Sequence, residues 1–550
     1  MTATPLTPAA RARRGLFAAA DWPRAALVLW LLFVTAVLPW RALTPVDETR
    51  YASVAWEMWL RRDLVVLWLN GEPYGHKPPL LFWLVNAGWA VFGVNAWWPL
   101  AIPALASAVS LVLLHRIATR LWPDRPAVAQ LAPLVLFGAA QWTVFSAALY
   151  FDLLLVTFVL LGVFALLDLA DGRPWRGSVL FAIAIGFGLL AKGPLVGINL
   201  LLLSLLLPWW RVGIARARWG RAWGLIAVSG TAGIAIAGAW LAAATARAGT
   251  GYLREIAYAQ GLGRVVDSFD HDLPFWWYLP MLAVIAFPWA WWLDGWRALA
   301  GLVRRHLDEP GVRLALSWAL PAFVMLSLIS GKRAHYLMGM LPALALLGAR
   351  ALEPLLERPG MRLGTAPAAV LMLAAAGGLA WVPTWAQRDS APPWASAFPA
   401  WLAAVPLVVA VTWFAVRRLD RRVLALAVGS AAICGMALVA FARFSAPAYD
   451  VTPAARRIAE AVARGVPVAV VGDYHGQFQF AGRLREPLPT LERRAVDGWL
   501  AEHPDGRVVV NVRRLPDPPP PDVWLYRSGW LMLADAALWA RLHGAPASDP

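Results

Sequence analysis

Residues 47–80 read DETRYASVAWEMWLRRDLVVLWLNGEPYGHKPPL, a polar segment between a first apolar run, residues 25–39, and a later one. An acidic pair, Asp47 and Glu48, opens this segment, and Lys77 followed by two prolines closes it. Ionisable groups are costly close to a bilayer, so a cluster of them there indicates a functional site. The alternative interpretation is a solvated loop with incidental charges.

The composition of the chain predicts a polytopic α-helical membrane protein. Of its 550 residues, 60% are hydrophobic and the mean hydropathy is +0.57, whereas a soluble protein is about 45–50% apolar. Apolar runs that can cross a hydrocarbon core of about 30 Å recur along most of the length and predict about thirteen spans. The 34 Trp are typical of membrane interfaces.

The net charge of +16 is explained by short arginine-rich loops that face the cytoplasm and anionic lipid. A basic stripe with interleaved aromatic residues, which would indicate a nucleic-acid partner, is not found in the sequence. Arginines precede the first apolar run without a following cleavage site, so we expect an uncleaved span with a cytoplasmic N-terminus. The single Cys434 lies in an apolar run, which rules out an intramolecular disulfide.

The positive-inside rule orients the predicted spans. The rule assigns the loops with most of the arginines to the cytoplasmic side. Four candidate catalytic loops then lie on the outer side: residues 41–78, 141–152, 246–273 and 331–336. Residues 79–92 are short for a span and predict an in-plane helix at the outer surface, with a tilted span as the alternative, whereas residues 274–294 predict one span. We therefore expect a transmembrane domain over residues 1–445.

The tail has a different composition. Strand-like runs occur at residues 466–471, 507–512 and 523–531, and residues 454–463 favour a helix. These elements predict a soluble α/β domain over residues 449–550, and an odd number of spans places it in the periplasm. Asp473, Tyr474 and His475 follow the first strand-like run, where an ordinary loop is favoured over a catalytic role.

Lysine is rare in this chain. Only Lys77, Lys192 and Lys332 occur among 49 basic residues, and the predicted topology places all three outside. A lysine supplies a compact ammonium group, whereas an arginine supplies a planar guanidinium group. The three lysines therefore suggest positions at which an ammonium group is needed. The alternative is that these lysines remain by chance.

The residue types at the outer face suggest charge neutralisation rather than acyl transfer. Lys77, Arg264 and Tyr336 can stabilise a leaving phosphate by positive charge and hydrogen-bond donation. Asp47 can act as a general base or orient a nucleophile. The sequence has no glycine-rich nucleotide loop, so a phosphate carried on a membrane lipid fits better than a nucleotide donor.

Several motifs together resemble a known family. They are Asp47–Ala52, Leu69–Gly71, Lys77–Leu80, Asp152, Ala191–Gly193, Pro274–Pro280 and Lys332–Pro342. This set resembles the aminoarabinose (4-amino-4-deoxy-L-arabinose) lipid A transferases. Those enzymes are GT-C glycosyltransferases that use polyprenyl-phosphate donors, a superfamily that includes the protein O-mannosyltransferases. The resemblance covers most of residues 25–445 and is weak in the tail.

The resemblance implies an inner-membrane, inverting glycosyltransferase. Its donor would be undecaprenyl-phosphate-linked aminoarabinose, and its acceptor would be lipid A. The implied catalytic residues are Asp47, Asp152 and Glu48. The implied donor-phosphate ligands are Lys77, Arg264 (with Arg254 as competitor), Tyr336, Lys192 and Lys332. The implied cavity residues are Arg50, Tyr51, Tyr74 and His271.

Alternatives remain at several of these positions. Lys77 can simply extend to the interface, Lys192 can cap a span, and Asp152 can pair structurally with Lys192 or Arg264. No cofactor is implied. A divalent metal held by His76, His271 or His335 with the acidic pair stays open, because no ligand spacing is diagnostic.

Two other functions are alternatives to lipid A modification. A polyprenyl-phosphate hexose transferase acting on protein or another surface glycan would use the same donor chemistry. A lipid or sugar transporter should have repeated halves with broken helices at the bilayer centre, and no such repeat is visible in the sequence.

Overall fold

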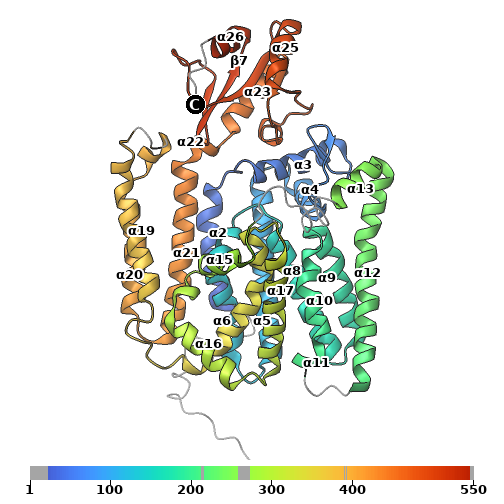
Figure 1. The fold of residues 1–550 in the computed structure, drawn as a ribbon, viewed down its shortest axis with the longest axis vertical. Coiled ribbons are helices and arrows are strands. Elements are labelled where there is room, and N and C mark those ends of the chain that lie inside the picture. Colours follow the sequence, from blue (N-terminus) through green and yellow to red (C-terminus); the bar gives the residue numbers. More distant parts are fainter. Residues whose placement is uncertain (1–22, 212–215, 258–272, 389–390, 392, 545–550) are drawn as a thin grey trace, which may run out of the picture.

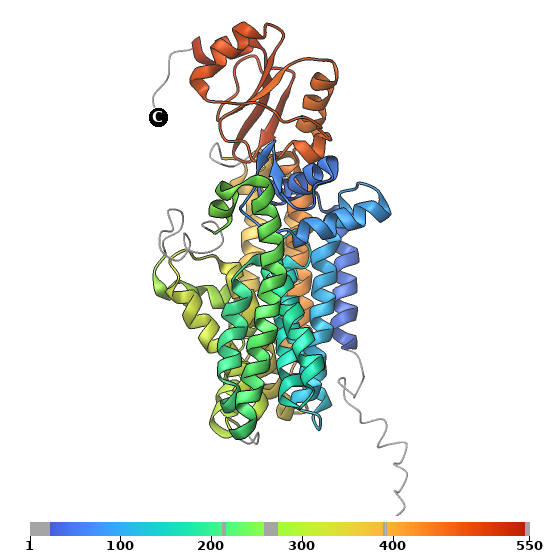
Figure 2. The ribbon, with the colours of Figure 1, turned by 90° about the vertical axis from the view of Figure 1, so that its right-hand side faces the viewer.

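The structure is a computed structural model that describes residues 23–211, 216–257, 273–388, 391 and 393–544. It consists of a long bundle of helices with a smaller sheet-containing unit at one end (Figures 1 and 2). The helix α3 (Asp47–Arg61) lies between the two parts. The polar segment over residues 47–80 therefore begins where the bundle meets the sheet.

Within the described residues, eight helical segments are long and apolar enough to cross a membrane. They are α5 (Trp97–Leu121), α8 (Asp152–Ala170), α9 (Pro174–Lys192), α12 (Arg216–Ala248), α17 (Pro310–Leu328), α18 (Leu341–Leu352, extended by flanking turns), α19 (Ala366–Trp385) and α21 (Leu419–Phe444). Shorter apolar helices accompany them: α2 (Arg24–Val37), α4 (Leu80–Phe92), α6 (Pro126–Gly138), α10 (Leu195–Leu205), α15 (Tyr278–Ile285) and α20 (Ala404–Ala415). The chain is a polytopic α-helical membrane protein, as its composition predicts.

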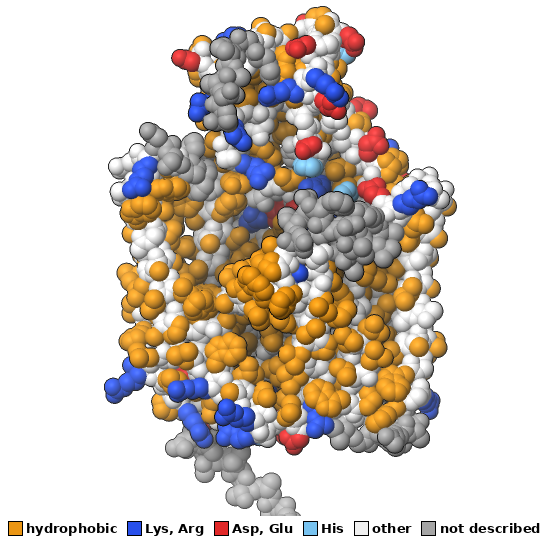
Figure 3. Space-filling model, viewed as in Figure 1, with side chains coloured by type: hydrophobic (Ala, Val, Ile, Leu, Met, Phe, Trp, Pro, Cys, Tyr) orange, Lys and Arg blue, Asp and Glu red, His pale blue; other side chains and the backbone are white. Residues whose placement is uncertain are grey.

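The surface of the bundle has the polarity of a membrane protein. Hydrophobic side chains cover its middle, whereas Lys and Arg side chains gather at the end opposite the sheet and at the junction with the sheet (Figure 3). At the opposite end, buried or half-buried ion pairs tie the helices together. Examples are Arg422–Asp294 at 2.6 Å, Arg350–Glu309 at 2.5 Å and Arg120–Asp168 at 2.9 Å.

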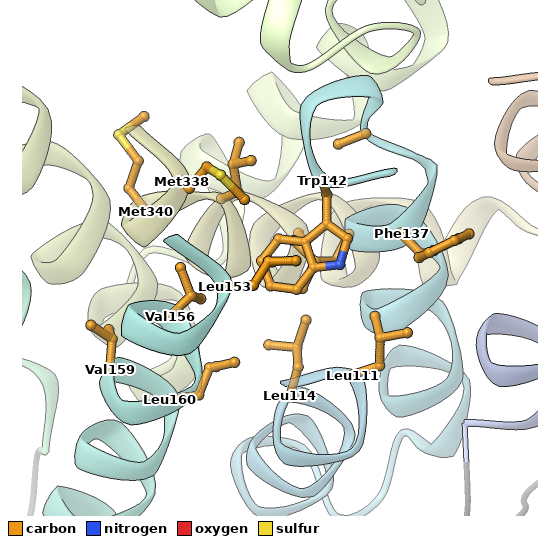
Figure 4. Close-up of a cluster of buried hydrophobic side chains, with 14 of the residues drawn as sticks. Leu111, Leu114, Phe137, Trp142, Leu153, Val156, Val159, Leu160, Met338 and Met340 are labelled. Atoms are coloured by element: carbon orange, nitrogen blue, oxygen red, sulfur yellow. The ribbon is translucent and has the colours of Figure 1, made fainter. Parts of the chain in front are cut away.

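The core of the bundle is packed around Trp142 on the short helix α7 (Ala140–Phe145). Its indole meets Leu114 of α5 and Leu153 of α8 (Figure 4), and its Nε1 donates a hydrogen bond to Ser107 Oγ at 2.9 Å. A buried indole N–H usually needs such a partner. This packing fixes the loop between α7 and α8, which carries part of the candidate site.

The predicted single span over residues 274–294 is wrong. The helix α15 ends at Ile285, and α16 (Leu293–Arg305) begins only after Pro288. Proline cannot donate a helical hydrogen bond, so it breaks the run. α16 is amphipathic and carries Asp294, which pairs with Arg422.

The first polar segment folds into α3, a small hairpin and α4. Asp47 and Glu48 occupy the first turn of α3 and Arg61 the last, an arrangement that the helix dipole favours. The hairpin pairs β1 (Trp68–Leu69) with β2 (Glu72–Pro73). Its turn is Asn70-Gly71, and both residues have positive φ, as tight hairpin turns require.

The C-terminal unit is a five-stranded sheet with helices on both faces. The strand order is β4-β3-β5-β7-β6. The strands are β3 (Val468–Val471), β4 (Thr490–Leu491), β5 (Arg507–Val512), β6 (Val523–Tyr526) and β7 (Gly529–Ala534). The helix α23 (Thr452–Ala463) packs on one face, and α25 (Val496–Glu502) and α26 (Ala536–Gly544) pack on the other.

The strand-like run over residues 523–531 is two strands rather than one. β6 and β7 pair as an antiparallel hairpin in which Tyr526 lies opposite Gly529. Arg527 between them has a φ of 57°, which reverses the chain. The hydrophobic pattern alone did not reveal this turn, because Arg-Ser is not a typical turn pair.

Candidate active site

Asp47 is an accessible carboxylate at the start of α3. Its Oδ2 accepts a hydrogen bond from Tyr150 Oη at 3.3 Å, and its Oδ1 lies 3.7 Å from Arg50 Nη2. The side chain remains 35% exposed. Asp47 is thus held by two neighbours but still open to an approaching ligand.

Glu48 is different from its neighbour, because it is buried and fully engaged. Its carboxylate pairs with Arg41 Nη2 at 2.6 Å, accepts bonds from Thr44 N at 2.8 Å and Thr44 Oγ1 at 2.7 Å, and accepts a bond from Leu149 N at 2.9 Å. These contacts join the loop before α3 to the loop before α8. The geometry favours a positioning residue rather than the catalytic role predicted from the acidic pair.

Lys77 and Tyr51 meet on one aromatic ring. Lys77 Nζ lies 5.8 Å from the ring centroid of Phe151, and Tyr51 packs edge-on against the same ring at 4.9 Å. Tyr51 also contacts the ring of Tyr150 at 6.2 Å. The structure therefore brings the lysine of the KPPL motif close to the loop that precedes Asp152.

Tyr74 lies in the same segment, where its ring stacks on His76 at 5.3 Å. Tyr74 is buried, and its hydroxyl lies beside the Arg50 guanidinium.

Asp152 and Lys192 form a buried ion pair. Asp152 begins α8 and Lys192 ends α9, and their side chains are only 2% and 6% exposed. Lys192 Nζ contacts Asp152 Oδ1 directly and lies 5.3 Å from the ring centroid of Tyr336. The second carboxylate oxygen, Asp152 Oδ2, has no partner among the described residues.

His335 links the two halves of the site. Its ring contacts Tyr336 at 5.0 Å and Tyr150 at 6.1 Å. A continuous chain of contacts therefore runs from Asp47 through Tyr150, His335 and Tyr336 to Lys192 and Asp152, and we call these six residues the contact network. Sequence reasoning missed Tyr150 and gave His335 only a metal-binding role. The position of Tyr150, two residues before Asp152, is the signal that could have identified it.

Lys332 lies apart from this network. Its Nζ donates hydrogen bonds to Leu273 O at 2.9 Å and Ile329 O at 2.6 Å. Backbone carbonyls thus take two of the three donors of its ammonium group. This favours a role in joining two chain segments over the predicted phosphate contact.

Two predicted site residues, Arg264 and His271, lie outside the described residues. Arg254, the competitor for Arg264, lies on α13 (Thr250–Ala257). On the same helix, Glu255 accepts a bond from Gly75 N at 2.9 Å. This bond connects the helix that follows α12 to the segment that leads into the KPPL motif. In the described part of the chain, no group of three or more His, Cys, Asp or Glu side chains is placed to hold a metal ion.

The tyrosines around Asp47 remain protonated donors. Burial, and then the Asp47 carboxylate, raise the pKa of Tyr51 and of Tyr150. Burial also raises the pKa of Tyr74, although the neighbouring Arg50 guanidinium opposes that shift. Their phenol groups can thus donate hydrogen bonds to an anion across the physiological pH range.

The C-terminal unit holds the Asn70-Gly71 turn of the first polar segment. Asn70 Nδ2 donates to Leu488 O at 3.0 Å. Asn70 Oδ1 accepts bonds from Leu488 N at 2.9 Å and Gln479 Nε2 at 2.7 Å. One side chain therefore fastens the hairpin next to the site to the C-terminal sheet.

A second set of contacts joins the C-terminal unit to α3. Ser53 Oγ donates to Gly476 O at 2.6 Å, and Trp56 Nε1 donates to Leu484 O at 2.8 Å. His475, which precedes Gly476, belongs to the loop for which the sequence favours no catalytic role. Burial, followed by the charge of Arg50, lowers the pKa of His475. This loop therefore approaches the candidate site.

An apolar groove of about 370 Å³ lies between α6 and the helices α15 to α18. Leu136, Trp289, Phe323 and Leu344 contribute to it, and Met340 lies at its wall, four residues after Tyr336. A groove of this kind is suited to a hydrocarbon chain.

Comparisons with known proteins support this description of the fold. The family model for dolichyl-phosphate-mannose-protein mannosyltransferase matches residues 76–245. The crystal structure of ArnT from Cupriavidus metallidurans bound to undecaprenyl phosphate is 20% identical in sequence, with a TM-score of 0.69 over 94% of this chain and 97% of that one. The chain therefore shares the fold of this membrane protein.

Sequence comparison with curated proteins gives more specific relatives. The undecaprenyl phosphate-α-4-amino-4-deoxy-L-arabinose arabinosyl transferase of Pseudomonas aeruginosa (strain LESB58) is 32% identical over 332 residues. The match covers 59% of this chain and 58% of that protein. The protein of the same name from Edwardsiella ictaluri is 29% identical and is covered to 60%. The chain spans less than two thirds of the length of these relatives and is similar to them over that part, which confirms the resemblance seen in its motifs.

Proposed function

We propose that this chain is an inner-membrane glycosyltransferase that moves 4-amino-4-deoxy-L-arabinose from undecaprenyl phosphate to lipid A. The observation that carries the proposal is the contact network, which brings cationic and phenolic donors beside an accessible carboxylate. The names of the related proteins, which specify this sugar and this lipid, support the choice of donor.

The chemistry requires stabilisation of a leaving phosphate. The bond between the anomeric carbon and the donor phosphate oxygen breaks, and its electron pair leaves with undecaprenyl phosphate. Lys77, Lys192 and Tyr336 supply positive charge and hydrogen-bond donors for that anion. A new bond forms between the anomeric carbon and an acceptor phosphate oxygen on the opposite face, which inverts the anomeric centre.

The acceptor determines the role of Asp47. A lipid A phosphate is already anionic, so positioning dominates and no strong base is needed. In that case Asp47, held by Tyr150 and Arg50, orients the amino sugar. A hydroxyl acceptor would instead require proton removal by this carboxylate.

The second candidate function is transfer of a hexose from a polyprenyl phosphate to protein or another surface glycan. The match of residues 76–245 to the mannosyltransferase family model favours it. The two functions share the donor phosphate site and differ in acceptor, so the product distinguishes them.

The proposed topology places the site at the outer face of the membrane. We assign about thirteen spans, a transmembrane domain over residues 1–445, a cytoplasmic N-terminus, and a periplasmic α/β domain over residues 449–550. The Lys and Arg side chains at the end of the bundle opposite the sheet (Figure 3) support this orientation, because cytoplasmic loops are rich in them. The contact network then faces the periplasm.

A reconstituted transfer reaction tests the proposal. Purified full-length protein, undecaprenyl-phosphate-linked aminoarabinose and lipid A should give lipid A with one added aminopentose by mass spectrometry. Lys77→Ala should reduce the rate about 100-fold or more, and the matched variant Lys77→Arg, which keeps the charge, should retain more activity. Unmodified lipid A together with a glycosylated peptide acceptor would instead favour the second function.

A further inference from the structure

The helix α13 is fastened to the segment that leads into the KPPL motif by two of its side chains. Tyr252 Oη donates to Tyr74 O at 3.3 Å, and Glu255 Oε1 accepts from Gly75 N at 2.9 Å. Tyr252 is buried, whereas the Glu255 side chain is 38% exposed. The Glu255 carboxylate is thus held in place beside the segment and is still open to solvent.

The close approach of Glu255 depends on the glycine at position 75. A Cβ atom there would lie 2.8 Å from Cδ and 2.9 Å from Cγ of Glu255, so any other residue would push the carboxylate away from the backbone amide. The sequence Tyr74-Gly75-His76-Lys77 therefore admits a carboxylate from a distant helix. This carboxylate lies within two residues of the lysine that is assigned to the donor phosphate.

Most of the hydrogen-bonding capacity of this carboxylate is unused within the described residues. An ionised carboxylate has two oxygens with about four acceptor sites, and Gly75 N takes one of them. The His76 ring is a further neighbour, but its Nε2 lies 3.6 Å from Glu255 Oε1, which is too long for a hydrogen bond. In the part of the chain that the structure describes, Glu255 forms no ion pair with a lysine or an arginine. Glu255 can therefore accept further bonds from a cation.

Glu255 belongs to the same polar region as Asp47. Burial raises the pKa of Tyr74, the Arg50 guanidinium opposes this shift, and the charges of Asp47 and Glu255 add to it. Two carboxylates, one from α3 and one from α13, thus lie close enough to the same phenol to act on it. The candidate site extends from Asp47 past Tyr74 to Glu255.

The sugar of the proposed donor carries a positive charge at a fixed place. As a primary amine, its 4-amino group is protonated at neutral pH, and C4 lies across the six-membered ring from the anomeric carbon that bears the phosphate. A partner for this ammonium group must therefore lie about one sugar ring away from the phosphate ligands. Gly75 and Lys77 are two residues apart, so their Cα atoms are separated by at most about 7 Å. The position of Glu255 beside Gly75 meets this requirement.

We propose that Glu255 binds the 4-ammonium group of the donor sugar and so selects an amino sugar over a neutral pentose. This inference rests on the proposed function for the identity of the sugar. A hydrogen bond between an ammonium group and a carboxylate is about twice as strong as one between neutral groups. The contact therefore distinguishes an amine at C4 from a hydroxyl group, which has a similar size but no charge.

A cycle of two proteins and two donors tests this role. The donors are undecaprenyl-phosphate-linked 4-amino-4-deoxy-L-arabinose and the analogue with L-arabinose, which has a hydroxyl group at C4. The unchanged protein should prefer the amino donor about ten-fold or more in kcat/KM. Glu255→Gln should lose most of this preference, chiefly through a raised KM for the amino donor, because the glutamine still accepts from Gly75 N but has no charge.

The matched control is Glu72→Gln. It removes the same charge from an exposed position of the neighbouring hairpin and should keep the preference for the amino donor. The same preference in Glu255→Gln as in the unchanged protein would overturn the proposal. An equal loss of transfer with both donors would also overturn it, because Glu255 would then serve only to join α13 to the segment before Lys77.

Donor binding without an acceptor separates this proposal from the proposed function. Native mass spectrometry of the purified full-length protein should show a preference for the amino donor that depends on Glu255. Such a preference without any transfer to lipid A would refute the transferase activity and leave the role of Glu255 standing. Transfer to lipid A with an unchanged donor preference in Glu255→Gln would keep the transferase activity and refute that role.

Discussion

Lys192→Met removes one partner of a buried ion pair within the contact network. Lys192 and Asp152 are 6% and 2% exposed, and Asp152 Oδ2 has no other partner among the described residues. Removing one member of such a pair leaves an uncompensated buried charge, which costs about 3–5 kcal/mol. The variant should therefore be strongly destabilised as well as inactive.

The stability of these variants can be measured through the single cysteine of the chain. Cys434 is buried in α21, so a thiol-reactive fluorophore should report unfolding in detergent as the thiol becomes accessible. Lys192→Met should unfold at a clearly lower denaturant concentration. The double variant Asp152→Asn/Lys192→Met buries no charge and should regain most of the lost stability.

The transfer activity of the double variant distinguishes a structural role of Lys192 from a catalytic one. Lys192 is assigned to the donor phosphate, so the double variant should stay inactive even when it is folded. Normal stability of Lys192→Met would refute the buried pair. Recovered sugar transfer in the double variant would refute the phosphate role.

Three further predictions concern neighbouring residues. Glu48→Gln should lower the free energy of unfolding by about 1–3 kcal/mol, because Glu48 joins two loops. Asp47→Asn should keep its thermal stability but change the transfer activity. Equal stability of the two variants would contradict the positioning role of Glu48. Asn70→Ala removes three hydrogen bonds to the C-terminal unit and should lower kcat more than it raises the donor KM in steady-state assays. The raised pKa of Tyr74 keeps its phenol protonated at alkaline pH, so Tyr74→Phe should leave the alkaline limb of the kcat/KM profile between pH 7 and 10 unshifted; a shift would show that Tyr74 titrates there.

The sequence predicts best those structural features that depend on residues close together in the chain. Apolar runs predict the helical membrane bundle because the bilayer requires each span to satisfy its own backbone hydrogen bonds. The acidic first turn of α3 and the Asn70-Gly71 turn follow from helix-dipole and turn chemistry. The break near Pro288 was missed because hydropathy does not register a lost backbone donor.

The site was harder to predict, because its contacts join distant segments. Asp47 and Glu48 are adjacent in sequence, but only the fold reveals that Arg41 and Leu149 N surround Glu48 while Asp47 stays open. Tyr150 enters the site through the loop between α7 and α8, which brings its hydroxyl to Asp47. The contacts of the C-terminal unit with Asn70 connect residues more than 400 positions apart, a separation that no local pattern can indicate.

The central claim is tested most directly by mass spectrometry of lipid A from cells with and without this chain. The account predicts an added aminopentose that disappears both without the chain and in cells that carry only the Lys77→Ala variant. Lipid A of the same mass in all three, under conditions in which the donor lipid is present, would contradict it.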